Sequence, residues 1–197
     1  MKNLILAAGA CVVLLLAGCA GVQRSVGGER IVERSDSSQP KWQNVPFSES
    51  KEKMYFSGTV KNVGDYSVGL RQAKAEALKN VAESIQTKVR TEFAENTRGS
   101  NLSTEELGKF VQDGVAMVAD NIEISGLLPV ENYYEKVERT TWGGVEYAYN
   151  CSVLVELAVS DYKIARKRAI EGLAEAARRE NNKAAEVTAL ELLEKLY

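Results

Sequence analysis

The stretch VEYAYNCSVLVEL, residues 145–157, decides the fold of this chain. Its odd positions carry apolar or aromatic side chains, and the even positions between them are mostly polar or small. Because successive side chains of a strand point to opposite faces, this alternation predicts one strand with a buried face and a largely solvated face. At about 3.3 Å per residue the strand would be about 43 Å long. The residues expected to face inward are Val145, Tyr147, Tyr149, Cys151, Val153, Val155 and Leu157.

The residues just before this strand predict its antiparallel partner. The sequence TTWGG, residues 140–144, should form a turn, because its paired glycines can take positive φ. Upstream of the turn, residues 122–128 predict a strand, Pro129 should interrupt it, and residues 130–139 should continue in an extended conformation. Together these segments predict a β-hairpin with Trp142 at its tip.

A long amphipathic helix is predicted over residues 67–95. Its apolar positions recur at steps of three or four, and alanines are abundant. Either Asp65 or Ser67 can cap its first turn. At 1.5 Å per residue the helix would be about 43 Å long, so it matches the long strand and is expected to lie across the sheet. Its apolar stripe consists of Leu70, Ala73, Ala77, Val81, Ile85, Val89 and Phe93.

Shorter elements complete the order. Residues 54–60 predict a strand, in which Gly58 marks a bulge or a close approach by another backbone. Residues 103–121 predict a second helix that starts with a capping box. Residues 161–197 predict two helices or one bent helix, divided at residues 181–182. The order β-α-α-β-β predicts an α+β fold with two layers, an antiparallel sheet covered by helices, and a C-terminal helical extension.

The first eighteen residues have the features of an export signal. The apolar run from Leu4 to Leu16 has 13 residues, whereas a membrane-spanning helix needs about 20. The motif that follows it, Leu16-Ala17-Gly18-Cys19, resembles the lipobox of bacterial lipoproteins. The resemblance implies cleavage before Cys19 and acylation of that residue, and two acyl chains would anchor it stably. The alternatives are an ordinary secretory signal with a stray cysteine, or a short anchor helix.

The chain is accordingly expected to have four parts. Residues 1–18 are the lipoprotein signal peptide, and residues 19–41 are a lipidated flexible tether rich in Gly and Ser, with a reach of about 25 Å. Residues 42–160 form the α+β domain and residues 161–197 the C-terminal helical region. A short strand around residues 30–33 is a possibility within the tether. Ala20, after the cysteine, resembles the enterobacterial sorting pattern for the outer membrane, so we expect its periplasmic face as the location.

Composition narrows the classes of function. Charge is nearly balanced, with 25 Lys+Arg and 27 Asp+Glu, whereas a nucleic-acid-binding chain would show a strong basic excess. The chain has no histidine, which is the commonest metal ligand and general base near neutral pH. After cleavage only Cys19 and Cys151 would remain, too few for a disulfide framework or a cysteine-based zinc site. We therefore expect no enzyme activity, no metal, no cofactor and no nucleic-acid partner. Cys151 is either a small buried residue or an intermolecular bridge.

Several side chains are candidates for partner contacts, each with a plainer alternative. Trp142 is either a binding aromatic or a side chain that folds back over the sheet edge. Tyrosines 133, 134, 147 and 149 form either a ladder on which a glycan stacks or part of the core. A basic cluster over residues 163–168 either touches phosphate head groups or is a solvated helix face. The apolar stripe over residues 185–196 packs either on its own domain or on another copy. The candidate contact residues are Trp142, Tyr147, Tyr149, Leu192, Leu193 and Leu196.

These features together resemble the LPP-twenty lipoprotein family and the related domains of the flagellar envelope proteins FlgP and FlgT. The resemblance covers about residues 40 to 160. It implies an outer-membrane lipoprotein whose relatives act as assembly or structural parts, in some cases as subunits of rings around the flagellar motor, and it carries over no catalytic residues. We therefore expect a structural role through contacts with other envelope proteins or with itself; the alternative is a module that binds peptidoglycan or another envelope ligand. The features that carry the resemblance are the lipobox at Cys19, Trp42, Gly58, the helix with Ala73, Ala77 and Ala82, and the hairpin strand Tyr147 to Leu157.

Overall fold

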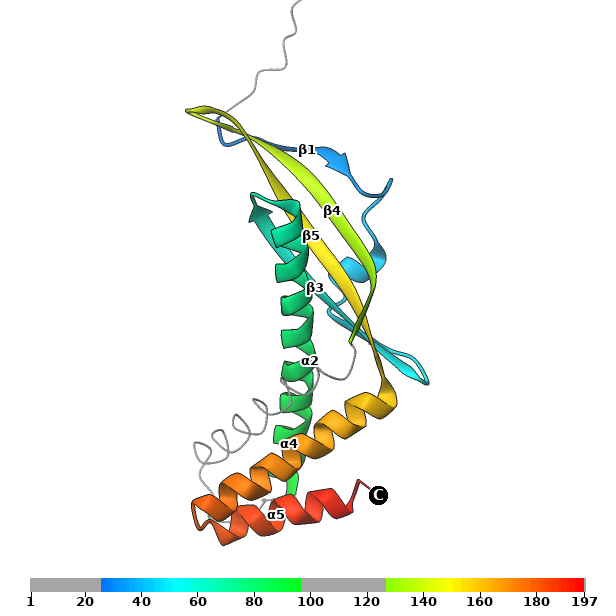
Figure 1. Cartoon of the computed structure of the whole chain (residues 1–197), viewed down its shortest axis with the longest axis vertical. Coiled ribbons are helices and arrows are strands. Elements are labelled where there is room, and N and C mark those ends of the chain that lie inside the picture. Colours follow the sequence, from blue (N-terminus) through cyan, green and yellow to red (C-terminus); the bar gives the residue numbers. More distant parts are fainter. Residues whose placement is uncertain (1–25, 97–126, 197) are drawn as a thin grey trace, which may run out of the picture.

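The structure is a computed structural model that describes residues 26–96 and 127–196. Over these residues the fold is α+β, as predicted: helices pack on a five-stranded antiparallel sheet with strand order β1-β4-β5-β3-β2 (Figure 1). The predicted helix over residues 103–121 lies outside the described residues. The strands are β1 (Glu29–Arg34), β2 (Phe47–Glu49), β3 (Lys53–Val63), β4 (Leu128–Thr141) and β5 (Gly144–Ala158), and the helices are α2 (Tyr66–Asn96), α4 (Val159–Arg179), α5 (Lys183–Glu194) and the short 3-10 helix η1 (Lys41–Asn44).

The long helix α2 lies across one face of the sheet, against β3 and β5, as its length and apolar stripe predict. Asp65 caps it, since the backbone N–H of Val68 donates to Asp65 Oδ1 at 2.8 Å. Gly58 is the point of closest approach between helix and sheet. A Cβ at Gly58 would overlap Ala73 O and Ala77 N of α2. The predicted close approach at Gly58 is therefore confirmed. The bulge of β3 lies elsewhere, between Val60 and Val63, beside Asn62 with its φ of 60°.

The β4–β5 hairpin forms as predicted, with two differences. Of the strand predicted over residues 122–128, residues 122–126 lie outside the described residues. β4 starts at Leu128 and continues through Pro129, where the ladder shifts register between Pro129 and Glu131 but does not end. A proline has no N–H to donate, and a bulge at that point removes the need for one. At the other end Thr141 pairs with Gly144, so the turn is two residues long, and of the paired glycines only Gly144 has positive φ, at 130°.

The prediction of one buried and one solvated face on β5 is wrong in both halves of the strand. In the half near α4, Ser152 and Leu154 on the supposedly solvated face are buried, Leu154 to 8% exposure. The chain segment that contains η1 packs over that face of β3 and β5, and Ser57 Oγ donates to Val45 O at 3.1 Å. In the half near the turn, Val145 and Tyr147 on the supposedly buried face are exposed, because α2 does not extend that far.

The predicted flexible tether over residues 19–41 is wrong for its second half, and the domain begins well before residue 42. Residues 29–34 form β1, which pairs antiparallel with β4. The pairing extends to Gly27, whose N–H donates to Thr140 O at 2.8 Å. The alternative of a short strand around residues 30–33 is therefore confirmed, and charges help to hold it: Arg30 Nε donates to Glu138 Oε1 at 2.9 Å. At most the residues between Cys19 and Gly27 connect the predicted lipid to the sheet.

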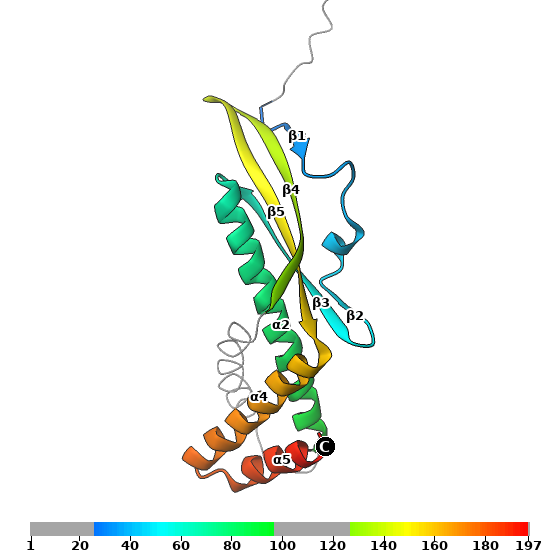
Figure 2. The same cartoon turned by 45° about the vertical axis from the view of Figure 1, so that its right-hand side comes forward.

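The C-terminal region forms two helices rather than one bent helix, and both belong to the domain. Asn181 takes a φ of 54°, and Asn182 caps α5 by accepting from the N–H of Ala185 at 3.1 Å. α5 folds back along α4, and both helices contact α2 (Figure 2). Their buried residues, including Leu173 and Ala189, are continuous with the core beneath the sheet. Residues 161–196 therefore extend the core instead of forming a separate appendage.

Candidate functional site

An open groove lies between α2, the β2–β3 hairpin and the start of α4. We call it the α2–α4 groove. Its volume is about 710 Å³. Its floor is apolar: Met54 and Phe56 are buried there, and the partly exposed ring of Phe47 stands 5.1 Å from that of Phe56, centroid to centroid. The remaining lining residues are Pro46, Glu49, Asn80, Glu83, Ser84, Thr87, Lys88, Thr91, Val159, Tyr162, Lys163 and Arg166.

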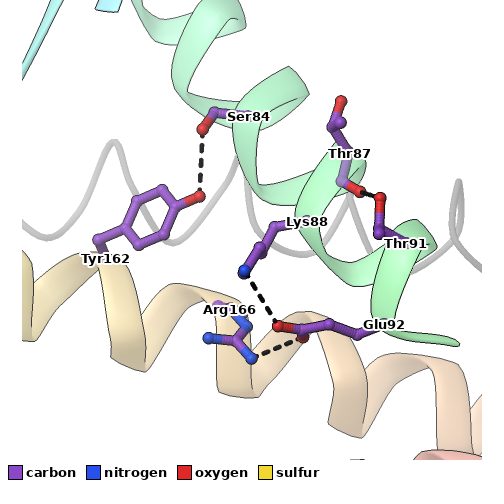
Figure 3. A network of polar contacts seen from close by, with 7 residues as sticks. All are labelled: Ser84, Thr87, Lys88, Thr91, Glu92, Tyr162 and Arg166. Carbon is purple, nitrogen blue, oxygen red and sulfur yellow. Dashed lines mark hydrogen bonds and ion pairs between the residues drawn. The ribbon is translucent and has the colours of Figure 1, made fainter. Parts of the chain in front are cut away.

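A polar network ties α2 to α4 along the wall of this groove (Figure 3). Tyr162 Oη and Ser84 Oγ share a hydrogen bond of 3.1 Å. Arg166 Nη2 donates to Glu92 Oε2 at 2.6 Å, and Lys88 Nζ lies 3.6 Å from Glu92 Oε1. Both side chains of the Arg166–Glu92 pair are largely shielded from solvent, so the pair joins the two helices more firmly than an exposed ion pair would. The network therefore sets the angle between α2 and α4.

The electrostatics of the wall favour a fixed surface over a proton-transfer site. Burial raises the pKa of the Tyr162 phenol, although the hydrogen bond to Ser84 and the charge of Arg166 act in the opposite direction. This phenol therefore stays neutral at physiological pH and serves as a hydrogen-bonding group. Among residues 26–96 and 127–196 no three His, Cys, Asp or Glu side chains stand close enough to hold a metal ion. What the groove offers is an apolar floor with a charged and hydroxyl-bearing rim, which suits an apolar side chain carried by a polar segment.

The tyrosines of the hairpin do not form a single ladder. Tyr134 and Tyr149 pack against Tyr66 at the start of α2, with ring centroids 4.8 and 5.9 Å from the Tyr66 ring. Tyr133, the neighbouring residue on the opposite face of the sheet, is buried. This burial, and to a smaller extent its hydrogen bond to Glu135, raises the pKa of its phenol to about 12. Of the candidates, Tyr149 is thus mostly a packing residue.

Tyr147 lies beyond α2 and is half exposed. Its phenol donates to Glu138 Oε2 at 3.2 Å, and Lys136 Nζ stands 5.0 Å from its ring centroid. Glu138 is buried, and it also accepts from Arg30 of β1. Tyr147 therefore helps to close a polar contact across three strands, with one side of its ring left open to solvent.

Trp142 stands clear of the sheet at the tip of the hairpin. It is 93% exposed, so it does not fold back over the sheet edge. Val145 of β5 and Val26, the first described residue, are also exposed apolar side chains at this end of the molecule. The lipobox residues Leu16, Ala17, Gly18 and Cys19 lie outside the described residues.

The C-terminal candidates are largely covered by their own chain. Leu192 is buried in the core, and Leu193 and Leu196 are partly buried against it. The stripe of α5 therefore packs on α2 and α4, and Leu192 is not available to a second copy. Within the basic cluster, Arg166 pairs with Glu92, and Lys167 lies 3.8 Å from Glu171, so these two charges have partners inside the domain.

Cys151 is a buried packing residue. It lies beneath Gly69 of α2, where a Cβ on Gly69 would come within 2.6 Å of its Sγ atom. Burial raises the pKa of the thiol, so the reactive thiolate is disfavoured. An intermolecular bridge through Cys151 would require this helix–sheet contact to open.

The α2–α4 groove was not predicted from the sequence, because its parts come from residues 46 to 166. One signal was present on α2: polar residues at positions 80, 84, 87, 88 and 91 form a second stripe beside the buried one. Comparisons of the chain with protein-family models, with curated proteins and with solved structures gave no match. The resemblance to the LPP-twenty family therefore stays a prediction.

Proposed function

We propose that this protein is an envelope lipoprotein, held on the outer membrane through acylated Cys19, with a structural or assembly role exerted through protein–protein contacts. The observation that carries the anchor is the Leu16-Ala17-Gly18-Cys19 motif directly after a 13-residue apolar run. Two or more acyl chains on one residue are enough for stable membrane attachment. In the described parts of the chain, no helix has the length and apolar character needed to cross a bilayer.

The position of the first described residues supports the same proposal. Gly27 and Gly28 form backbone hydrogen bonds with Thr140 of β4, so the chain is attached to the sheet from the eighth residue after the lipidation site. A lipid on Cys19 would then hold the whole domain close to the membrane surface. The domain extends away from this end along α2 towards α4 and α5, which would place the α2–α4 groove on the side remote from the bilayer (Figures 1 and 2).

The groove is the described surface best suited to the assembly part of the proposal. Its apolar floor is formed by the buried side chains of Met54 and Phe56, and Phe47 at its edge is partly exposed. The rim carries both signs of charge, with Glu49 from β2, Glu83 from α2 and Lys163 from α4. Apolar centres surrounded by polar rims are the usual anatomy of contacts between proteins. An envelope partner, or a second copy, would insert an apolar side chain there.

The anchor is tested by replacing its sulfur. Cys19→Ser should abolish labelling of the protein by radioactive palmitate and move it from the membrane fraction to the soluble fraction. Cys11→Ser, which removes the cysteine of the leader, is the matched control and should keep both the label and the membrane location. A Cys19→Ser protein that stays in the membrane fraction would refute the anchor.

The assembly role is tested by crosslinking in intact cells. A photoreactive residue in place of Thr87, exposed on the groove side of α2, should give a discrete crosslinked species that mass spectrometry identifies. The same replacement at Arg90, exposed on the same helix but outside the groove lining, should not give that species. Equal crosslinking at both positions, or none at Thr87, argues against the groove as the contact surface.

A further inference from the structure

We propose that the tip of the β4–β5 hairpin inserts into the head-group region of the same membrane that holds the lipid, so that the domain has a second, non-covalent contact with the bilayer. The inserted surface consists of Val26, Trp142 and Val145, which we call the apolar apex. The proposal rests on the acylation of Cys19 proposed above. It adds an orientation: the hairpin tip faces the membrane, and the α4–α5 end faces away from it.

The length of chain before the apex limits where the apex can be. Val26 is the seventh residue after Cys19, so even a fully extended chain would span no more than about 25 Å between them. Backbone hydrogen bonds then fix the chain beside the hairpin tip, because Thr140 accepts from the N–H of Gly27 at 2.8 Å and its own N–H donates to Gly28 O at 3.2 Å. The lipid attachment point is therefore always near the apex.

The same limit excludes the reversed orientation. α2 has 31 residues, about 46 Å at 1.5 Å per residue, and it separates the hairpin end of the domain from the α4–α5 end. With α5 against the bilayer and the hairpin pointing outward, the apex would stand farther from the membrane than the connecting chain can reach. Two orientations therefore remain: the domain contacts the bilayer through its apex, or it lies along the membrane surface. The chemistry of the apex distinguishes these two orientations.

The apex has the composition of a membrane-interface contact. Trp142 is 93% exposed and Val145 42% exposed, and Val26 is exposed beside them. Exposing these side chains to water is unfavourable, whereas indole rings are favoured at the level of lipid head groups, where one end is apolar and the other is hydrated. The six residues from Thr140 to Val145 carry no charge.

Two charges flank the uncharged tip: Arg139 is paired within the domain, and the Glu146 carboxylate accepts a hydrogen bond of 3.5 Å from Thr141 Oγ1. Arg139, just before the uncharged tip, forms an ion pair with Glu29 of β1 and donates to Asn62 Oδ1 at 3.1 Å. Thr141 Oγ1 donates to Gly144 O at 3.1 Å, which satisfies a carbonyl of the turn. Insertion limited to the uncharged residues from Thr140 to Val145 therefore leaves the Glu146 carboxylate in the hydrated part of the head-group region.

The two tryptophans of the chain allow a direct test. Trp42 of η1 lies away from the apex, with its Nε1 donating to Glu131 Oε2 at 2.5 Å, so it is the matched control. The acylated full-length mature protein is reconstituted on phosphatidylethanolamine–phosphatidylglycerol vesicles, with and without bromine on the acyl chains. Trp42→Phe reports Trp142, and Trp142→Phe reports Trp42. The difference between the wild type and Trp142→Phe gives the Trp142 signal independently, in case Trp42→Phe does not fold.

We expect Trp142 emission to move to shorter wavelength on the vesicles and to lose intensity with brominated lipid, while Trp42 emission does neither. Flotation of the vesicles separates the anchor from the apex. If the protein floats and Trp142 is not quenched, the insertion is refuted and the acyl anchor stands. If both tryptophans are quenched, the domain lies along the surface and the proposed orientation is refuted. If the acylated protein does not float, the anchor fails and this inference fails with it.

Discussion

The two halves of strand β5 share one alternating sequence pattern but have opposite environments. From Cys151 to Val155 every side chain is buried, on both faces of the sheet. From Gly144 to Tyr147 every residue is exposed. The tip half and the base half, as we call them, therefore differ in what covers them and not in their own pattern. Alternation predicts that a strand forms; it does not predict whether another element reaches each part of it.

The boundary between the halves is where α2 begins. The carbonyl of Tyr66, the first residue of α2, lies 3.9 Å from Cys151 Sγ, and α2 runs from there towards the base. β3 also ends there, with Val63 paired to Tyr149. Beyond this point only β1, β4 and β5 continue, held by ladder hydrogen bonds and charge pairs. The base half should therefore carry most of the stability, and the tip half should tolerate substitution.

The largest effect should come from filling the closest contact of the base half. Gly58→Ala would place a methyl group against backbone atoms of α2 at Ala73 and Ala77, which cannot move aside as a side chain can. We expect a loss of about 3 kcal/mol in the free energy of unfolding, measured by denaturant titration. Gly64→Ala is the control, because a Cβ there meets no atom within 4 Å. Equal stability of the two variants would mean that the helix and sheet are not packed as described.

Two valines on the same face of β5 compare the halves directly. Val155→Ala removes fully buried methyl groups from the base half and should cost about 2 kcal/mol, including the cavity that it leaves. Val145→Ala makes the same chemical change ten residues earlier, at an exposed position of the tip half, and should cost less than about 0.5 kcal/mol. Both values come from thermal or denaturant unfolding. A similar cost at both positions would contradict the difference in coverage, unless the tip is covered by a bound partner.

Features encoded by neighbouring residues could be predicted from the sequence. The helix over residues 67–95 was placed within one residue at each end, because its apolar stripe is long and regular. The close approach at Gly58 could be predicted because glycine weakens the interior of a strand and often marks a site where another backbone comes close. The break at residues 181–182 followed from two asparagines between stripes that are out of phase.

Features that depend on distant partners could not be predicted. β1 reads ERIVER, a charged segment with little apolar signal, so the sequence offered a strand there only as an alternative to the tether. Its pairing with β4, which places Glu138 opposite Arg30, has no local signal. The burial of Leu154 depends on a segment about 110 residues earlier in the chain. Of the candidate sites, the lipobox is a local motif, whereas the α2–α4 groove has no local signature beyond a polar stripe on one helix.

Removing the helix cap at the boundary between the halves should have a smaller effect on the free energy of unfolding. Asp65→Ala removes the acceptor for the Val68 N–H and should destabilise the protein by about 1 kcal/mol. Ser67→Ala, at the other candidate cap, should change stability by only a few tenths of a kcal/mol, since Ser67 lies exposed inside the first turn. Denaturant unfolding of both variants measures the difference. The reverse ranking would move the start of α2, and with it the start of the base half, two residues along the chain.

The smallest expected effect is a pH dependence confined to the base end. Hydrogen bonds from Arg178 and then from Lys183 lower the pKa of Glu186, where α5 folds back on α4. A carboxyl group whose folded-state pKa is below its unfolded value stabilises the protein above the unfolded value, and this contribution is lost as the pH falls through the folded value. Lowering the pH from about 7 to about 3 should therefore destabilise the wild type more than Glu186→Gln, which lacks the titrating group. Glu191→Gln, which removes an exposed carboxylate from the same helix, is the matched control. If Glu186→Gln and the wild type lost stability in parallel as the pH falls, the ion pairs of Glu186 would not stabilise the α4–α5 turn. Packing of buried residues such as Ala189 would then be what holds α5 against the core.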